Sequence, residues 1–164
     1  MVDIVFDGSV TTSQTSGIIG TTTNNNADAG SVGEYVSGQV VFASRIGITT
    51  ATEKDIISIS LTAGDWDVSG IAGFFGTGTT SVDMQSGWIS STSATAPDIS
   101  LRVAGIYPTG ARVLYASGAM GWQYGIPPTR MSLSATTTIY LSVRAVFSVS
   151  TLASYGSISA RRVR

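Results

Sequence analysis

The sequence predicts an all-β protein, an antiparallel β-sandwich or jelly roll of about eight strands. Three observations support this prediction. Short segments in which apolar and polar residues alternate recur along the chain, as expected of strands with one buried face. Gly, Pro, Ser and Asn separate these segments, as turn residues do. No segment keeps apolar residues at helical spacing for more than one turn, so almost no helix is expected.

The clearest strand pattern covers residues 139–149. From Ile139 to Val149 every second residue is apolar, and these side chains are expected to point inward. In residues 65–75 the inward face carries Trp66 and Phe74. In chain order, strands are expected over residues 34–42, 55–61, 65–75, 82–91, 99–103, 112–116, 130–134, 139–149 and 155–163.

Residues 1–30 are predicted to form an extended N-terminal arm in front of a β-sandwich domain of residues 31–164. Val2, Ile4 and Phe6 alternate with polar or acidic neighbours, as in a short half-buried strand. The Thr-, Ser-, Asn- and Gly-rich tract that follows has too few apolar side chains to pack, and so long a structureless loop is improbable inside a compact domain. We therefore expect an apolar strand on a flexible tether, with these three residues binding a partner.

The composition excludes several kinds of site. The chain contains no cysteine and no histidine, so it lacks disulfides, thiolate metal sites, and the commonest general base and metal ligand. We expect no catalytic residue, no cofactor and no bound metal. The acidic start of the chain does not resemble a signal peptide. No apolar run is long enough for a membrane helix, so we expect synthesis in the cytoplasm and no membrane insertion.

Charge is distributed very unevenly along the chain. Residues 1–98 contain all ten acidic residues, whereas residues 99–164 contain seven of the eight arginines and no acid. Pairing between distant strands could bring the two halves together within one fold. Alternatively, the basic end, and in particular Arg161, Arg162 and Arg164, meets an acidic surface of a partner. Binding to nucleic acid is not expected, because three charges on a chain with a pI near 5.1 would bind weakly in physiological salt.

Asp65 and Asp67 are the single tight pair of carboxylates within a predicted strand. Residues i and i+2 of a strand point to the same side, about 7 Å apart, which is compatible with the spacing that a glycosidase needs. A cation site and a solvated strand edge are the other interpretations, and the last of these is the expected one.

Aromatic residues in predicted loops are candidates for stacking on sugar rings. The segment from residue 121 to residue 128 places Trp122 and Tyr124 between glycines and prolines. These two side chains could contact a glycan. Packing in the core or at a subunit interface is the alternative expectation.

Several segments together resemble a β-domain of tailed-phage structural proteins, which occurs at the C-terminal ends of tail fibres and as small stand-alone virion proteins. The resemblance covers most of the chain from about residue 31. It is carried by Gly33-Glu34-Tyr35, the segment from Ser60 to Gly70 (SLTAGDWDVSG), Gly87-Trp88-Ile89-Ser90, Arg130-Met131-Ser132-Leu133-Ser134, Thr138-Ile139-Tyr140-Leu141, Tyr155-Gly156 and Arg161-Arg162.

This resemblance implies a jelly-roll-like β-sandwich, usually trimeric, that serves as a capsid decoration (cement) protein or a fibre tip. It transfers no catalytic residue. The chain has a short arm where a fibre would have a long repetitive shaft, which favours decoration of the phage head. The expected partners are further copies in a homotrimer and the major capsid protein or other virion proteins. Receptor binding at a tail tip, with Trp122 and Tyr124 on a host surface glycan, is the second possibility. A glycoside-active enzyme using Asp65 and Asp67 is the third.

Overall fold

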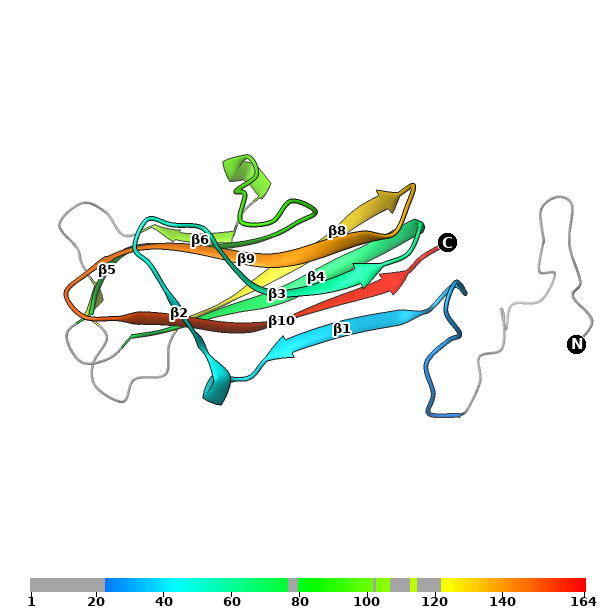
Figure 1. Cartoon of the computed structure of the whole chain (residues 1–164), viewed down its shortest axis with the longest axis horizontal. Helices are drawn as coiled ribbons and strands as arrows, with labels where there is room; N and C mark the ends of the chain where they lie inside the picture. Colours follow the sequence, from blue (N-terminus) through cyan, green and yellow to red (C-terminus); the bar gives the residue numbers. More distant parts are fainter. Residues whose placement is uncertain (1–22, 77–79, 102, 107–112, 115–121) are drawn as a thin grey trace, which may run out of the picture.

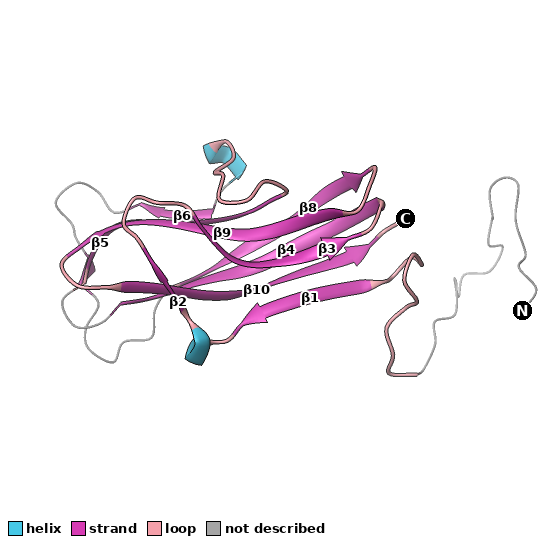
Figure 2. Ribbon diagram, in the orientation of Figure 1, coloured by secondary structure: helices cyan, strands magenta, loops and turns pink. Residues whose placement is uncertain are grey.

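The computed structural model describes residues 23–76, 80–101, 103–106, 113–114 and 122–164. Its strands form two antiparallel sheets that pack face to face, as Figures 1 and 2 show. The proposed arm residues Val2, Ile4 and Phe6 lie outside the described residues.

The first sheet has the strand order β1-β10-β4-β8. These strands are β1 (Tyr35–Val40), β10 (Leu152–Arg162), β4 (Gly64–Gly76) and β8 (Gln123–Leu133). The short strand β2 (Ile46–Ile48) also pairs with β10, on the side of β1. The 3₁₀ turn η1 (Phe42–Ser44) separates β1 from β2.

The second sheet has the order β3-β9-β5-β6. It contains β3 (Lys54–Leu61), β9 (Thr137–Ser148), β5 (Ser81–Ser90) and β6 (Val103–Ile106), with the two-residue β7 (Val113–Leu114) also beside β5. The chain alternates between the sheets so that sequence neighbours are seldom sheet neighbours, which is the arrangement of a jelly roll. The predicted all-β, jelly-roll-like sandwich is therefore confirmed. The only helical segments among the described residues are η1 and η2 (Ile99–Leu101).

The core lies between the two sheets and follows from the alternation of side chains along each strand. On β4, Trp66, Val68, Ala72 and Phe74 are fully buried, as the sequence predicts. On β9 the inward residues Ile139, Leu141, Val143 and Ala145 are also fully buried. No helix among the described residues is long and apolar enough to span a membrane.

Three parts of the sequence prediction are wrong. Residues 99–103 are not one strand: the 3₁₀ turn η2 precedes β6. The strand expected at 130–134 begins at Gln123, within the segment that was interpreted as a loop. Val149 does not point into the core but is 63% exposed, because β9 ends at Ser148 and Val149 and Ser150 adopt positive φ in the turn to β10.

The two prolines of β8 explain why this strand is hard to recognise in the sequence. Pro127 and Pro128 lie where the register between β4 and β8 shifts, between Val68 and Gly70 of β4. Proline cannot donate a hydrogen bond to a neighbouring strand, and it is tolerated at bulges and on edge strands. β8 is the edge of its sheet, so the strand continues through both prolines.

Candidate functional site

The basic residues near the C-terminus have three different environments. Arg161 is exposed on the outer face of the first sheet. Arg162, the next residue along β10, is only 5% exposed and points inward. The Arg164 side chain is largely exposed and forms an ion pair with Asp65. Of the predicted partner-binding arginines, the structure therefore leaves Arg161 and much of Arg164 accessible.

Arg162 joins three parts of the fold at one end of the sandwich. Its Nε donates to Oε2 of Glu34 at 3.0 Å, and its Nη1 donates to the carbonyl oxygen of Ala63 at 2.8 Å. Its Nη2 donates to the Thr62 hydroxyl. The guanidinium also lies 4.4 Å from the centre of the Trp66 ring. One side chain thus ties β10 to the start of β1 and to the turn between β3 and β4.

Asp65 is the second centre of this charged network. The carboxylate is 4% exposed, and its Oδ2 accepts from Nη2 of Arg130 at 2.7 Å and from Nε of Arg164. Hydrogen bonds from the Ser132 hydroxyl, Arg130 and Arg164 hold the pKa of Asp65 far below its usual range. A carboxyl group that stays ionised cannot donate a proton at neutral pH, as a glycosidase general acid must. Asp67, exposed between Arg161 and Arg130 in the sheet, has no catalytic partner among its described neighbours.

Glu34 and Asp65 make the stability of the fold sensitive to acid. The Gly30 N–H lowers the pKa of Glu34, burial opposes this effect, and Arg162 lowers the pKa further. Because both carboxyls have lower pKa values in the folded than in the unfolded chain, the unfolded chain binds more protons as the pH falls. We expect the free energy of unfolding to be constant above about pH 5 and to decrease steadily below it.

Urea titrations at successive pH values check this expectation. Asp65→Asn should make the free energy of unfolding fall less steeply with decreasing pH. Asp28→Asn, a change at an exposed carboxylate outside the network, should leave this pH dependence as in the wild type. A wild-type profile that rises as the pH falls from 5 to about 3 would contradict the assignment.

The unequal halves of the sequence are brought together by strand pairing. The described ion pairs are Arg162 with Glu34, Arg164 and Arg130 with Asp65, and Arg144 with Glu53. Each joins an acid from the first 98 residues to an arginine from the last 66. In both sheets the strands of the two halves lie side by side, so much of the charge is compensated within one chain.

The two candidate glycan-contacting aromatics do not form one surface. Trp122 is 49% exposed just before β8. Tyr124 packs its ring at a near-perpendicular angle on Phe74, with ring centres 6.0 Å apart, and its hydroxyl donates to Oε1 of Gln85 at 3.3 Å. Tyr124 therefore belongs to the interior, as the period of two along β8 requires. Trp88 of β5 is also fully buried.

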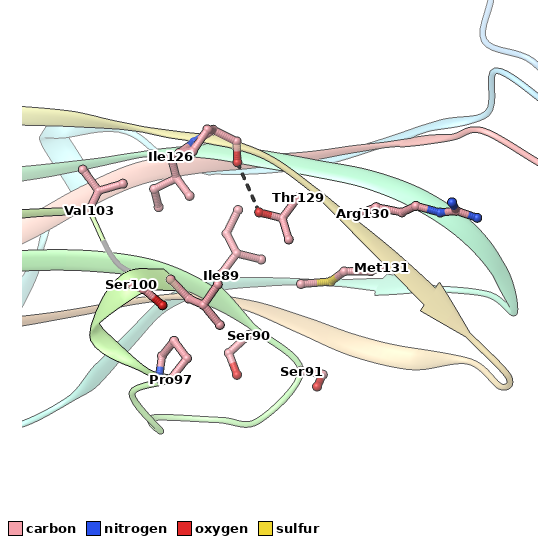
Figure 3. Close-up of a pocket in the computed structure, with 12 residues that line it drawn as sticks. Ile89, Ser90, Ser91, Pro97, Ser100, Val103, Ile126, Thr129, Arg130 and Met131 are labelled. Carbon is pink, nitrogen blue, oxygen red and sulfur yellow. Dashed lines mark hydrogen bonds between the residues drawn. The ribbon is translucent and has the colours of Figure 1, made fainter.

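A pocket of about 450 Å³ opens between β5, η2 and β8. Figure 3 shows the apolar side chains of Ile89, Val103 and Ile126 gathered there, and the Arg130 side chain extending away from them. The polar groups of its wall are serine and threonine hydroxyls, one of which, Thr129, hydrogen-bonds to the carbonyl of Pro127. Arg130 is the single charged residue in the wall, so the pocket has no set of groups for acid–base chemistry.

An apolar patch lies on the outer face of the first sheet and was not evident in the sequence. We call Val41, Phe42, Ile71, Phe75 and Tyr155 the aromatic patch. Phe42 contacts Phe75 and Tyr155 edge-on, with ring centres 5.1 and 5.3 Å apart. Arg45 covers one side, its guanidinium 4.8 Å from the Phe42 ring and 4.7 Å from the Phe75 ring.

The patch is also accessible, and Val41, Phe42, Ile71 and Tyr155 line one shallow pocket. Val41, Phe42 and Ile71 are each about half exposed, at 48%, 45% and 45%. Exposed apolar groups that touch one another are typical of surfaces that bind other proteins, whereas isolated ones need no explanation. Val41 and Phe42 follow β1, whereas the other residues of the patch come from β4 and β10. These segments are far apart in the sequence, so no local sequence signal could have indicated the patch.

No protein-family model and no curated protein matches the chain. Among solved structures, the chain is similar to part of a protein chain in the structure of infectious bursal disease virus Gx strain. The TM-score is 0.46, with 12% identity over 89% of this chain and 36% of that chain. A chain in the structure of the Gt strain of the same virus gives a TM-score of 0.35 and 13% identity over 77% of this chain and 30% of that chain. The chain thus spans about a third of the length of each of these proteins.

Proposed function

We propose that the chain is a non-enzymatic virion structural protein, a trimeric decoration (cement) protein on the outer surface of a tailed-phage head. The observation that carries the proposal is the exposed aromatic patch on a jelly-roll sheet, because it offers a surface for binding protein rather than a site for chemistry. The resemblance of the sequence to phage structural β-domains supports the same function. Arginine and aromatic residues, such as Arg45 and the Phe42 that it covers, are enriched at subunit interfaces.

Tail-tip receptor binding is the second candidate function. The observation that favours it is Trp122, whose half-exposed indole ring offers a face for stacking on a sugar. Location in the particle separates the two functions. A decoration protein occupies the head in hundreds of copies, whereas a receptor-binding protein is present in a handful of copies at the tail.

The proposal is tested on the isolated protein and on particles. We expect sedimentation to give three times the 16.9 kDa mass of one chain, and gel quantification of purified particles to give head-type copy numbers. The double variant Phe42→Ser, Ile71→Ser should weaken trimer formation or binding to the head about tenfold or more, because truncating residues at the centre of an interface can cost over 1 kcal/mol each.

Leu101→Ser is the matched control for this experiment. Leu101 is 63% exposed, but it lies in η2, beside the second sheet and away from the patch. This variant should sediment and decorate like the wild type. A monomer at micromolar concentration, or copy numbers typical of a tail, would overturn the proposal.

A further inference from the structure

The edge strand β1 is open on the side away from β10. Its register with β10 pairs Tyr35 with Arg161 and Gln39 with Ser157, and no other described strand bonds to it. An open edge presents a row of backbone groups that can pair with another strand.

Asn26 shows which residues of β1 face outward. Its side-chain amide accepts from the Tyr35 N–H at 2.9 Å and donates to the Tyr35 carbonyl at 2.7 Å, which are the two bonds that a neighbouring strand would make. The carbonyl of Glu34, one residue earlier, instead points to β10, since it accepts from the Arg162 N–H. In an antiparallel pair this direction alternates along the strand. The N–H and C=O groups of Ser37 and Gln39 therefore also face outward, with no partner among the described residues.

The gap between the two sheets is also incompletely covered at this edge. Val36 and Val40 of β1 and Ile57 of β3 are only partly buried, although all three pack against the core. Gly38 lies close to Ile57, because a Cβ atom at Gly38 would be 2.9 Å from the Ile57 Cδ1. A strand added beside β1 would bring every second side chain over this apolar gap.

The opposite edge of the same sheet is protected, whereas β1 is covered only at Tyr35, by Asn26. β8 carries Pro127, Pro128 and a register shift, which are features that prevent pairing with another chain. β1, with the sequence YVSGQV, contains no proline, no lysine and no other charge. Since natural edge strands usually carry such protection, the contrast indicates that the β1 edge is used.

We propose that the β1 edge binds the N-terminal segment of a second copy of this chain, residues 2–6, as an added strand. The segment has the required alternation: Val2, Ile4 and Phe6 would cover the apolar gap, while Asp3 stays on the outer face, on the side where β10 presents Arg161. Asn26 already occupies the Tyr35 end of the edge, which leaves room for a short strand at Ser37 and Gln39.

The length of chain between this segment and the domain favours a second copy over the same chain. A linker of about 20 residues, treated as a random coil, has a root-mean-square span of roughly 25 Å, enough to reach an adjacent subunit. Pairing within one chain would need only a short turn. Reciprocal exchange of arms in a trimer would make several weak contacts act together. The inference deepens the proposed function, because it names how the copies join.

Cysteine cross-linking tests the proposal directly, since the natural chain contains no cysteine. One tagged protein carries Asp3→Cys or, to sample register, Val5→Cys, and an untagged protein carries Ser37→Cys. After the two are mixed and oxidised, we expect a disulfide between the chains, formed about tenfold or more in excess over a Ser60→Cys acceptor. Ser60 is also an exposed serine, on β3 of the other sheet.

Hydrogen exchange provides a second readout that needs no cysteine. In the full chain the amides of Ser37 and Gln39 should be protected at high concentration and should lose protection on dilution or when residues 1–7 are removed. Three results would each overturn the proposal. The first is equal cross-linking to Ser37→Cys and Ser60→Cys. The second is a disulfide that forms only within one chain when that chain carries both Asp3→Cys and Ser37→Cys, and the third is amide protection that survives the truncation. Neither measurement depends on where the protein lies in the virion, so a negative result here leaves the proposed decoration function standing. Likewise, a tail-type copy number would leave the proposed strand exchange standing.

Discussion

Arg162→Ala is expected to destabilise the protein by about 3 kcal/mol or more, because removing one partner of a buried ion pair leaves the other charge without compensation. The Glu34 carboxylate would keep only the Gly30 N–H, at 2.8 Å, as a described donor. The bonds to Ala63 and Thr62 and the contact with the Trp66 ring would be lost in the same step. A urea denaturation curve measures the effect as a lower midpoint with an unchanged slope.

Arg161→Ala is the matched control for Arg162→Ala. The two arginines are adjacent on β10 and differ in the face they occupy, since Arg161 is exposed and has no ion pair among the described residues. Its replacement should change the free energy of unfolding by less than about 0.5 kcal/mol. Equal losses for the two variants would show that position in the strand, rather than the buried network, determines the effect.

Leu141→Ala should cost about 2–5 kcal/mol, the usual range for a fully buried leucine. Leu141 belongs to β9 and reaches across the sandwich to two glycines of the opposite sheet. A Cβ atom at Gly156 would lie 3.1 Å from its Cδ2, and one at Gly70 would lie 3.7 Å from its Cδ1. The glycines make room for this side chain, so the truncation leaves a cavity that neither strand has a side chain to fill.

Leu101→Ala tests the same chemical change at an exposed position. Leu101 is 63% exposed in η2, and its truncation should alter stability by less than about 0.5 kcal/mol. Thermal unfolding followed by circular dichroism would compare the two variants in one experiment. If Leu141→Ala were as stable as Leu101→Ala, the packing of β9 against Gly70 and Gly156 would be incorrect.

Local sequence features predicted the elements whose pattern is regular. β4 and β9 alternate along most of their length, and each has one face toward the core, so the buried residues from Trp66 to Phe74 and from Ile139 to Ala145 could be identified directly. β8 was only partly predicted, because Pro127 and Pro128 signal a loop unless the strand is known to be an edge with a bulge. The short strand β2 has too few residues for a pattern.

The candidate surfaces were less predictable than the strands. The unequal charges of the two halves suggested either pairing within the fold or a basic surface for a partner, and the sequence could not choose between them. The structure places Arg162 beside Glu34, which is 128 positions away, and so assigns this arginine to the fold while leaving Arg161 exposed. Trp122 and Tyr124 differ for a similar reason: only the register of β8 decides that Tyr124 points inward.

The sequence by itself therefore determined the fold class, most strands and the absence of histidine and cysteine chemistry, since these depend on composition and on a period of two residues. The tertiary structure alone decided which strands are neighbours. That decision created the Arg162 network, the aromatic patch and the open β1 edge, because each depends on residues from separate strands meeting side by side. Alternation along a strand states which side chains face inward, but it carries no information about the strand that lies alongside.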